Sequence, residues 1–144
     1  NKVLLDKLIS KLVKIAVNEL NFKNDFDYEV SILLTDNKRI RDLNHKYRNI
    51  RKETNVLAFP QKTSQKSLNE KNHLLGDIVI SLEKIKKEAK IQSKEFHEHF
   101  VHILLHGLLH LLGYDHMKKN DANEMESKEI KILSKLLIKN PYLH

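Results

Sequence analysis

Segments of helical periodicity alternate with short β-branched runs along the whole chain, and this alternation limits the fold more than any other feature. Over Lys2–Leu20, apolar residues recur every three or four positions and form one continuous stripe. The continuity of the stripe favours a helix packed on a core over one lying on a membrane surface. Four further helices are predicted: a short one through Ile40, Leu43 and Tyr47 that ends near Arg48–Arg51, and others over Leu82 to about Gln92, about Lys94–Leu112, and Asp121–Lys139.

Three runs of β-branched and apolar residues lie between these helices and predict strands. They span Tyr28–Thr35, Thr54–Phe59 and Gly76–Ser81. The polar stretch Gln61–His73 shows no periodicity and is predicted to be a long loop. The sequence contains no internal repeat and no sign of a domain boundary. We therefore predict a single domain over residues 1–144, of the α/β or α+β class, with a small sheet covered by helices.

The composition indicates a compact protein with an anionic partner. Apolar residues make up 40% of the chain and charged residues 31%. A sequence of this composition is too apolar to be disordered, and its apolar stretches are too often interrupted by charged residues to span a membrane. The absence of cysteine rules out disulfide bonds and cysteine zinc sites, and it suits a reducing cytoplasm. Lys and Arg number 26 against 19 Asp and Glu, and the resulting net charge of +7 favours a partner such as nucleic acid. We expect a cytoplasmic protein without a signal peptide or membrane association.

The segment HGLLHLLGYDH, which runs from His106 to His116, carries the strongest chemical signal. Two histidines four residues apart on a helix, His106 and His110, project from one face and can hold one ion. Gly113 then permits a sharp turn that would bring His116 back toward the same point. Three neutral imidazoles around a divalent ion leave a fourth position for water, as in catalytic zinc sites. The sequence therefore predicts one Zn²⁺ per chain, with Ni²⁺ as the alternative.

Two further polar residues lie near these predicted ligands. His102 is on the same helical stripe one turn before His106, about 6 Å further along the axis, which is too far for a fourth ligand. We interpret His102 as a neighbour of the ligands or a bystander. Asp115 either orients a ligand or caps the turn after Gly113, and the turn is slightly favoured.

The histidine spacing also matches the H-E-x-x-H-x-x-G-x-x-H pattern of metzincin proteases. The glutamate that acts as general base in those enzymes is replaced here by Gly107. Asp77 or Asp115 could supply another base, but nothing in the sequence places either residue beside the ion. A metalloprotease is therefore the second hypothesis.

Together with two other blocks, the histidine segment resembles the bacterial YbeY family of rRNA maturation endoribonucleases. These blocks are YRNIRKETNVLAFP at Tyr47–Pro60 and LGDIVIS at Leu75–Ser81, and they occur in that family's order. The resemblance implies an α/β sandwich, expected here to have a small mixed sheet of four strands, about five helices and a metzincin-like metal helix. It implies a metal-dependent endoribonuclease specific for single-stranded RNA, acting in maturation of the 16S rRNA 3′ end and in ribosome quality control. The implied partners are rRNA and the small ribosomal subunit, and not DNA.

The resemblance also assigns roles to individual residues. The three histidines match the family's metal ligands, and Arg48 matches its functional arginine after a tyrosine. Asp77 falls in the family's G-D block, which implies a structural role or a role supporting the ligands. Ala58 replaces a common serine, so no polar contact is expected from that position. On the residues alone, a solvated arginine at a helix end is the simpler interpretation of Arg48.

These residues suggest how a phosphodiester bond could be cleaved. A tri-histidine ion lowers the pKa of bound water from near 16 toward about 7, so the absence of a carboxylate base is no obstacle. Arg48 is then the candidate for neutralising negative charge on the phosphate. Water and the RNA 2′-hydroxyl both stay open as the attacking group. A third hypothesis is a ribosome-associated binding module that holds a structural ion.

Overall fold

Helices and strands interleave in the computed structural model, which describes residues 2–22, 27–61, 72–114 and 119–143. This order confirms the predicted α/β or α+β class, and the described residues form five helices, as expected. The elements are α1 (Lys2–Glu19), β1 (Asp27–Thr35), α2 (Asn37–Arg48), β2 (Val56–Pro60), β3 (Asn72–Ser81), α3 (Leu82–Ile91), α4 (Phe96–Leu111) and α5 (Lys119–Lys135).

The strands form one mixed sheet in the order β1-β3-β2. β1 runs parallel to β3, whereas β2 runs antiparallel to it. The expectation of four strands is wrong, because the described residues form three. Only three runs in these ranges have the β-branched pattern. The residues just before Gly76, from Asn72 onward, lengthen β3 and do not add a strand.

Gly76 allows β3 to continue past an irregular point in the sheet. Its φ angle is +147°, and a Cβ atom there would lie 2.3 Å from the carbonyl oxygen of Phe59 on the neighbouring strand. Only glycine tolerates this conformation and this close approach. The register of β1 shifts between Glu29 and Val30, opposite the same point. The long β3 therefore depends on a glycine at position 76.

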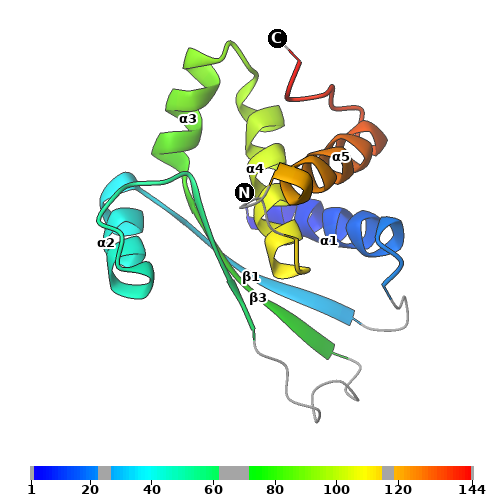
Figure 1. The fold of residues 1–144 in the computed structure, drawn as a ribbon, viewed down its shortest axis with the longest axis horizontal. Helices are drawn as coiled ribbons and strands as arrows, with labels where there is room; N and C mark the ends of the chain where they lie inside the picture. The colour runs from blue at the N-terminus through cyan, green and yellow to red at the C-terminus, as the bar shows by residue number, and fades with distance from the viewer. Residues whose placement is uncertain (1, 23–26, 62–71, 115–118, 144) are drawn as a thin grey trace.

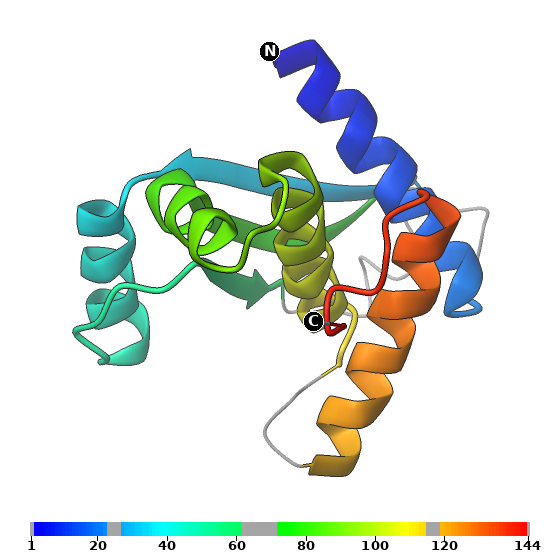
Figure 2. The ribbon, with the colours of Figure 1, turned by 90° about the horizontal axis from the view of Figure 1, so that it is seen from above.

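The two faces of the sheet carry different layers. Ile78 and Ile80 of β3 belong to the main core, which also takes buried residues from α1, α3, α4 and α5. Val79 points to the opposite face, since side chains alternate along a strand, and it packs with Leu57 of β2 and Ile40 of α2. Figure 1 shows α4 near the middle of the molecule, between α3 and α5. Figure 2 shows α2 at the opposite end from α1 and α5.

α1 packs as its sequence predicts. Its apolar stripe is buried through Leu12, Val13, Ala16 and Val17, and these residues join the main core. This burial confirms that the stripe is a core face. Across the described ranges, no helix combines the length and the apolar content that crossing a membrane requires.

Side-chain caps begin the two helices that follow strands β1 and β3. Oδ1 of Asp36 accepts a hydrogen bond from the backbone N–H of Arg39 at 2.8 Å, at the start of α2. Oγ of Ser81 accepts one from the N–H of Lys84 at 3.2 Å, at the start of α3. The Ser81 hydroxyl also donates to Oδ1 of Asn37 at 2.6 Å. This last bond ties the starts of α2 and α3 together.

The ends of the last two helices lie close to their predicted positions. Gly113 has a φ angle of +103°, which provides the turn expected just after α4. α5 begins before the predicted Asp121 and ends at Lys135, before the predicted Lys139. The earlier end follows from Leu137, whose φ angle is +62° and which turns the backbone out of the helix.

Ion pairs join the end of α1 to the end of α5. Lys131 Nζ lies 2.7 Å from Oε1 of Glu19, and Lys135 Nζ lies 2.7 Å from its Oε2. The hydrogen bonds from Lys131 and Lys135 lower the pKa of Glu19 from 4.5 to about 2. Glu19 therefore stays ionised well into the acid range.

Replacing Glu19 with Gln should remove an acid-sensitive part of the stability. Because the pKa of Glu19 is lowered from 4.5 to about 2, its contribution is complete above pH 4.5 and is lost as the pH falls toward 2. The difference in free energy of unfolding between wild type and Glu19→Gln, measured by urea titration, should therefore shrink as the pH is lowered through this range. The exposed Asp42 on α2 gives the control, Asp42→Asn, for which no comparable narrowing is expected. If the difference in free energy of unfolding between wild type and Glu19→Gln does not change with pH, the pKa of Glu19 is not lowered by its ion pairs.

Candidate metal centre

α4 brings two of the predicted ligands together. Nε2 of His106 lies 3.3 Å from Nε2 of His110, and the ring centroids are 4.8 Å apart with the planes at 81°. Both side chains are half-buried, whereas most of α4 is fully buried. The i, i+4 spacing therefore directs both Nε2 atoms toward one point at the edge of the core, as the sequence predicts.

The distance between the two nitrogens fits a shared cation. Zinc binds imidazole nitrogen at about 2.0–2.1 Å, so two nitrogens on a tetrahedral zinc ion lie about 3.3–3.4 Å apart. The observed separation of 3.3 Å falls within this range. His106 and His110 can therefore supply two ligands to one divalent ion without any change in α4.

The remaining predicted members of the centre, His116 and Asp115, lie outside the described residues. The third ligand therefore stays a prediction. Within the ranges that the structure does describe, no group of three or more His, Cys, Asp or Glu side chains could hold a metal ion.

A buried carboxylate lies behind His106. Glu129 of α5 is fully buried, and its Oε1 lies 2.8 Å from Nε2 of His102. The hydroxyl of Tyr142 donates to the same Oε1 at 2.8 Å and to Oε2 at 3.0 Å. Both carboxylate oxygens lie 3.4 Å from Nδ1 of His106. Glu129 thus meets hydrogen-bond donors from α4 and from the segment after α5.

These donors keep Glu129 ionised inside the protein. Burial by itself raises the pKa of Glu129, but the hydrogen bonds from His102 and His106, together with their electrostatic interactions with the carboxylate, outweigh burial and lower the pKa to about 2. Burial and the charge of Glu129 in turn raise the pKa of Tyr142 above its ordinary value. The phenol therefore stays protonated and acts as a donor. His102, which the sequence left as a neighbour or a bystander, is a neighbour that shares this carboxylate with His106.

The sequence reasoning missed Glu129 and Tyr142. One signal for Glu129 was available, because it lies on the same helical stripe as the buried residues Met125, Ile132 and Leu133. An acidic residue on an apolar stripe needs a buried partner. No comparable signal marks Tyr142. It lies beyond α5, and only the fold of the chain after that helix brings its hydroxyl to Glu129.

Gly107 lies against the sheet and not against the site. A Cβ atom at this position would lie 3.2 Å from Cγ2 of Ile78 and 3.2 Å from Cγ2 of Val56. These two side chains are β-branched and stiff, so they yield little. A glutamate at the position that holds the general base in the protease pattern would therefore press against Ile78 and Val56, which would have to shift by a few tenths of an ångström. This observation argues against the metalloprotease hypothesis.

Arg48 lies on the other side of the sheet from the histidine pair. It is the exposed last residue of α2, and its guanidinium forms no hydrogen bond or ion pair within the described ranges. The neighbouring Tyr47 packs edge-on against Phe59 of β2, with ring centroids 5.5 Å apart. Arg48 therefore stands beside strand β2, which lies at an edge of the sheet that the described residues form.

Asp77 is also not in contact with the histidine pair. It is exposed on β3 and pairs in register with Phe59. The next residue, Ile78, faces α4 at Gly107, so Asp77 points to the opposite face of the sheet. This is the face on which α2 packs.

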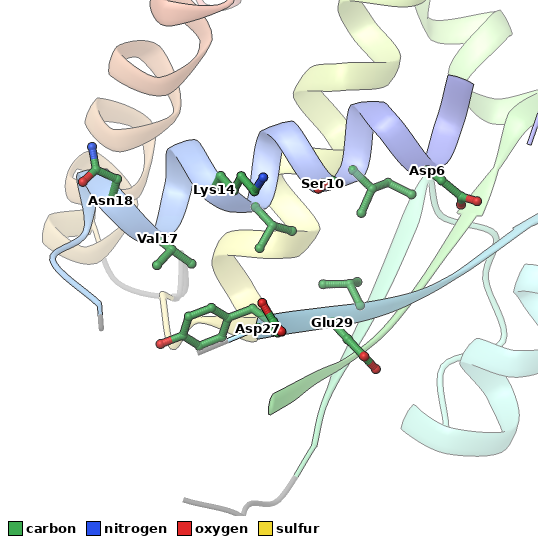
Figure 3. A pocket seen from close by; sticks show the side chains of 11 residues that line it. Asp6, Ser10, Lys14, Val17, Asn18, Asp27 and Glu29 are labelled. Atoms are coloured by element: carbon green, nitrogen blue, oxygen red, sulfur yellow. The ribbon is translucent and has the colours of Figure 1, made fainter. Parts of the chain in front are cut away.

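A hollow of about 660 Å³ lies between α1 and β1 (Figure 3), and none of the candidate site residues lines it. Its polar lining comes from Asp6, Ser10, Lys14, Asn18, Asp27 and Glu29. None of the lining residues is a histidine. The candidate site is therefore identified by its chemistry and not by the size of a cavity.

Comparisons with known proteins identify the family of this chain. The family model described as endoribonuclease YbeY matches residues 1–137. The chain belongs to the endoribonuclease YbeY family. It is 45% identical over 132 residues to endoribonuclease YbeY of Colwellia psychrerythraea, covering 91% of this chain and 83% of that protein. The protein of the same name from Anaplasma phagocytophilum is 44% identical over 133 residues, covering 92% and 82%.

A solved structure shares the fold. The solution structure of a protein from Thermotoga maritima matches with a TM-score of 0.57 and 22% identity, covering 100% of this chain and 94% of that one. The resemblance found in the sequence is thus confirmed. As a member of the YbeY family, the chain is an endoribonuclease, a hydrolase whose substrate is RNA.

Gly107→Val should destabilise the protein although valine is a better helix former than glycine. The added methyl groups would collide with Ile78 and Val56, and overpacking of this kind costs about 1–3 kcal/mol. Urea unfolding of the variant measures the loss. The control is His97→Val, at an exposed position of α4, which we expect to change the free energy of unfolding by less than about 0.5 kcal/mol. Equal stability of the two variants would show that α4 does not approach the sheet closely at residue 107.

Proposed function

We propose that this chain is a metal-dependent endoribonuclease that cleaves single-stranded RNA, and that its substrate is the rRNA of the small ribosomal subunit. In this proposal it matures the 3′ end of 16S rRNA and takes part in ribosome quality control in the cytoplasm. The observation that carries the metal dependence is the pair of Nε2 atoms 3.3 Å apart on α4. Membership in an endoribonuclease family supports RNA as the substrate.

His106 and His110 would hold the cation, and His116 is proposed as the third ligand. Zn²⁺ suits imidazole ligands, and Ni²⁺ is the alternative. When bound, a divalent cation supplies Lewis acidity toward a phosphate oxygen and toward water. The roles of the chain's own residues follow from where each side chain lies.

Arg48 is proposed to neutralise negative charge on the phosphate. Its guanidinium is exposed and has no partner in the described part of the chain that would compete for it. α2 packs on the face of the sheet that includes Leu57, whereas α4 packs on the opposite face. Because β2 is an edge strand, an RNA strand that crosses this edge could contact both Arg48 and the histidines.

The position of Asp77 favours a structural role for it, since it faces away from α4. The attacking group is either water or the 2′-hydroxyl of the RNA. A 2′,3′-cyclic phosphate on the product would identify the 2′-hydroxyl. The net charge of +7 supports binding to the RNA backbone without sequence readout, so we propose that a ribosomal partner selects the cleavage site.

The first test removes one ligand and, separately, the metal. His110→Ala should lower the rate of single-stranded RNA cleavage by about 100-fold or more, because it leaves only one imidazole at the described site. Treatment of the wild type with a chelator should abolish cleavage, and added Zn²⁺ should restore it. Cleavage rates are measured on proteins purified in parallel, with the exposed His97→Ala as the control.

Two outcomes would contradict the proposal. If His110→Ala cleaves RNA as fast as His97→Ala, the activity comes from another site or from a contaminating nuclease. If chelation unfolds the protein, as judged by circular dichroism, and reloading with Zn²⁺ restores the fold without turnover, the ion is structural. The protein would then be a binding module.

The second test concerns Arg48. Arg48→Ala should lower the cleavage rate by about 100-fold, as expected for loss of one group that stabilises the charge of the transition state. Arg48→Lys should recover only part of the rate, because lysine keeps the charge but not the paired donors. The exposed Arg41 on α2 provides the matched control, Arg41→Ala. If both alanine variants lose the same small amount of activity, Arg48 contributes only to general attraction of RNA.

A further inference from the structure

The carboxylate of Glu129 determines which nitrogen of His106 carries the hydrogen. An ionised carboxylate has no hydrogen to donate and can only accept. Both oxygens of Glu129 lie 3.4 Å from Nδ1 of His106, so this arrangement is favourable only when Nδ1 is protonated. A neutral imidazole has one N–H group, which leaves Nε2 with its lone pair. That Nε2 is the atom 3.3 Å from Nε2 of His110.

We propose that Glu129 is a positioning residue for the metal centre. By accepting a hydrogen bond from Nδ1 of His106, it holds the imidazole in the tautomer and orientation that present the Nε2 lone pair to a cation shared with His110. Carboxylates that accept from the second nitrogen of a ligand histidine fix its tautomer and raise its basicity in other metalloproteins. The part of the inference that concerns a cation rests on the proposed function, whereas the tautomer of His106 does not.

Two further donors hold this carboxylate in place. Nε2 of His102 and the hydroxyl of Tyr142 each lie 2.8 Å from Oε1. A buried carboxylate without such donors would be strongly disfavoured. Lys94 Nζ donates to the carbonyl oxygen of Pro141 at 2.8 Å, which fixes the chain beside Tyr142. The segment after α5 therefore takes part in orienting His106, although it lies far from His106 in the sequence.

The tautomer can be measured on the metal-free wild type. Two-bond ¹⁵N–¹H correlation spectra of ¹⁵N-histidine-labelled protein, recorded at about pH 8, where an ordinary imidazole is neutral, report which ring nitrogen carries the hydrogen. The His106 signals are assigned by their loss in His106→Gln. We expect protonation on Nδ1. Protonation of His106 on Nε2 would overturn the inference, and this measurement needs no variant of Glu129.

The consequence for the cation is measured by Zn²⁺ binding in competition with a chromogenic chelator. Glu129→Gln keeps the size of the side chain but removes the charge, and we expect it to weaken Zn²⁺ binding by about 10- to 100-fold. The same substitution at Glu126, on the same helix but outside the contacts with His106, is the matched control and should bind within about 3-fold of the wild type. Equal affinities for the two variants would overturn the inference.

The outcomes separate this inference from the proposed function. A wild type that binds no Zn²⁺ while His106 is protonated on Nδ1 would refute the proposed cation site but support the role of Glu129 in setting the tautomer. If Glu129→Gln does not fold, Tyr142→Phe serves as the second variant. It removes a donor that holds the carboxylate of Glu129 in place and leaves His106 itself unchanged, so we expect Zn²⁺ binding to weaken by about 3-fold or more. Zn²⁺ binding as tight as that of the wild type in the folded Tyr142→Phe protein would overturn the inference.

Discussion

The packing of α4 against the sheet is the contact on which the rest of the structure depends. Gly107 lets the helix approach so closely that a Cβ atom there would lie 3.2 Å from Ile78 and from Val56. With that side of α4 against the strands and most of the helix buried, His106 and His110 remain half-buried at the edge of the core. Packing of one side of a helix thus sets the position of the reactive groups on another side.

The second constraint is a negative charge inside the protein. Glu129 is fully buried, and His102, His106 and Tyr142 surround its carboxylate. Because a buried charge requires hydrogen-bond donors, the network joins α4, α5 and the segment that follows α5. The contact with His106, at 3.4 Å, is longer than the other two. Stability of the core and orientation of a candidate ligand therefore depend on the same carboxylate.

The spacing of the histidines in this chain matches the metzincin protease pattern, so the spacing alone does not identify the reaction. The residue after the first histidine distinguishes this chain from those proteases. In this chain Gly107 contacts the sheet, and a glutamate there would have to displace Ile78 or Val56. Arg48 stands beside β2 on the other face of the sheet. In the proposed function, an extended RNA strand would have to pass over that edge to contact both Arg48 and the histidines.

Local patterns in the sequence determined the helices and strands, the turn at Gly113, and the convergence of His106 with His110, since each depends on residues within a few positions of one another. The strand count and the start of β3 were not predictable in this way. The path of β3 through Gly76 depends on the carbonyl of Phe59 on another strand. Only the tertiary structure decided that Asp77 faces away from α4, and that Glu129 and Tyr142 lie beside the histidines. Those contacts join distant segments, and their energies come from burial and charge, which periodicity does not encode.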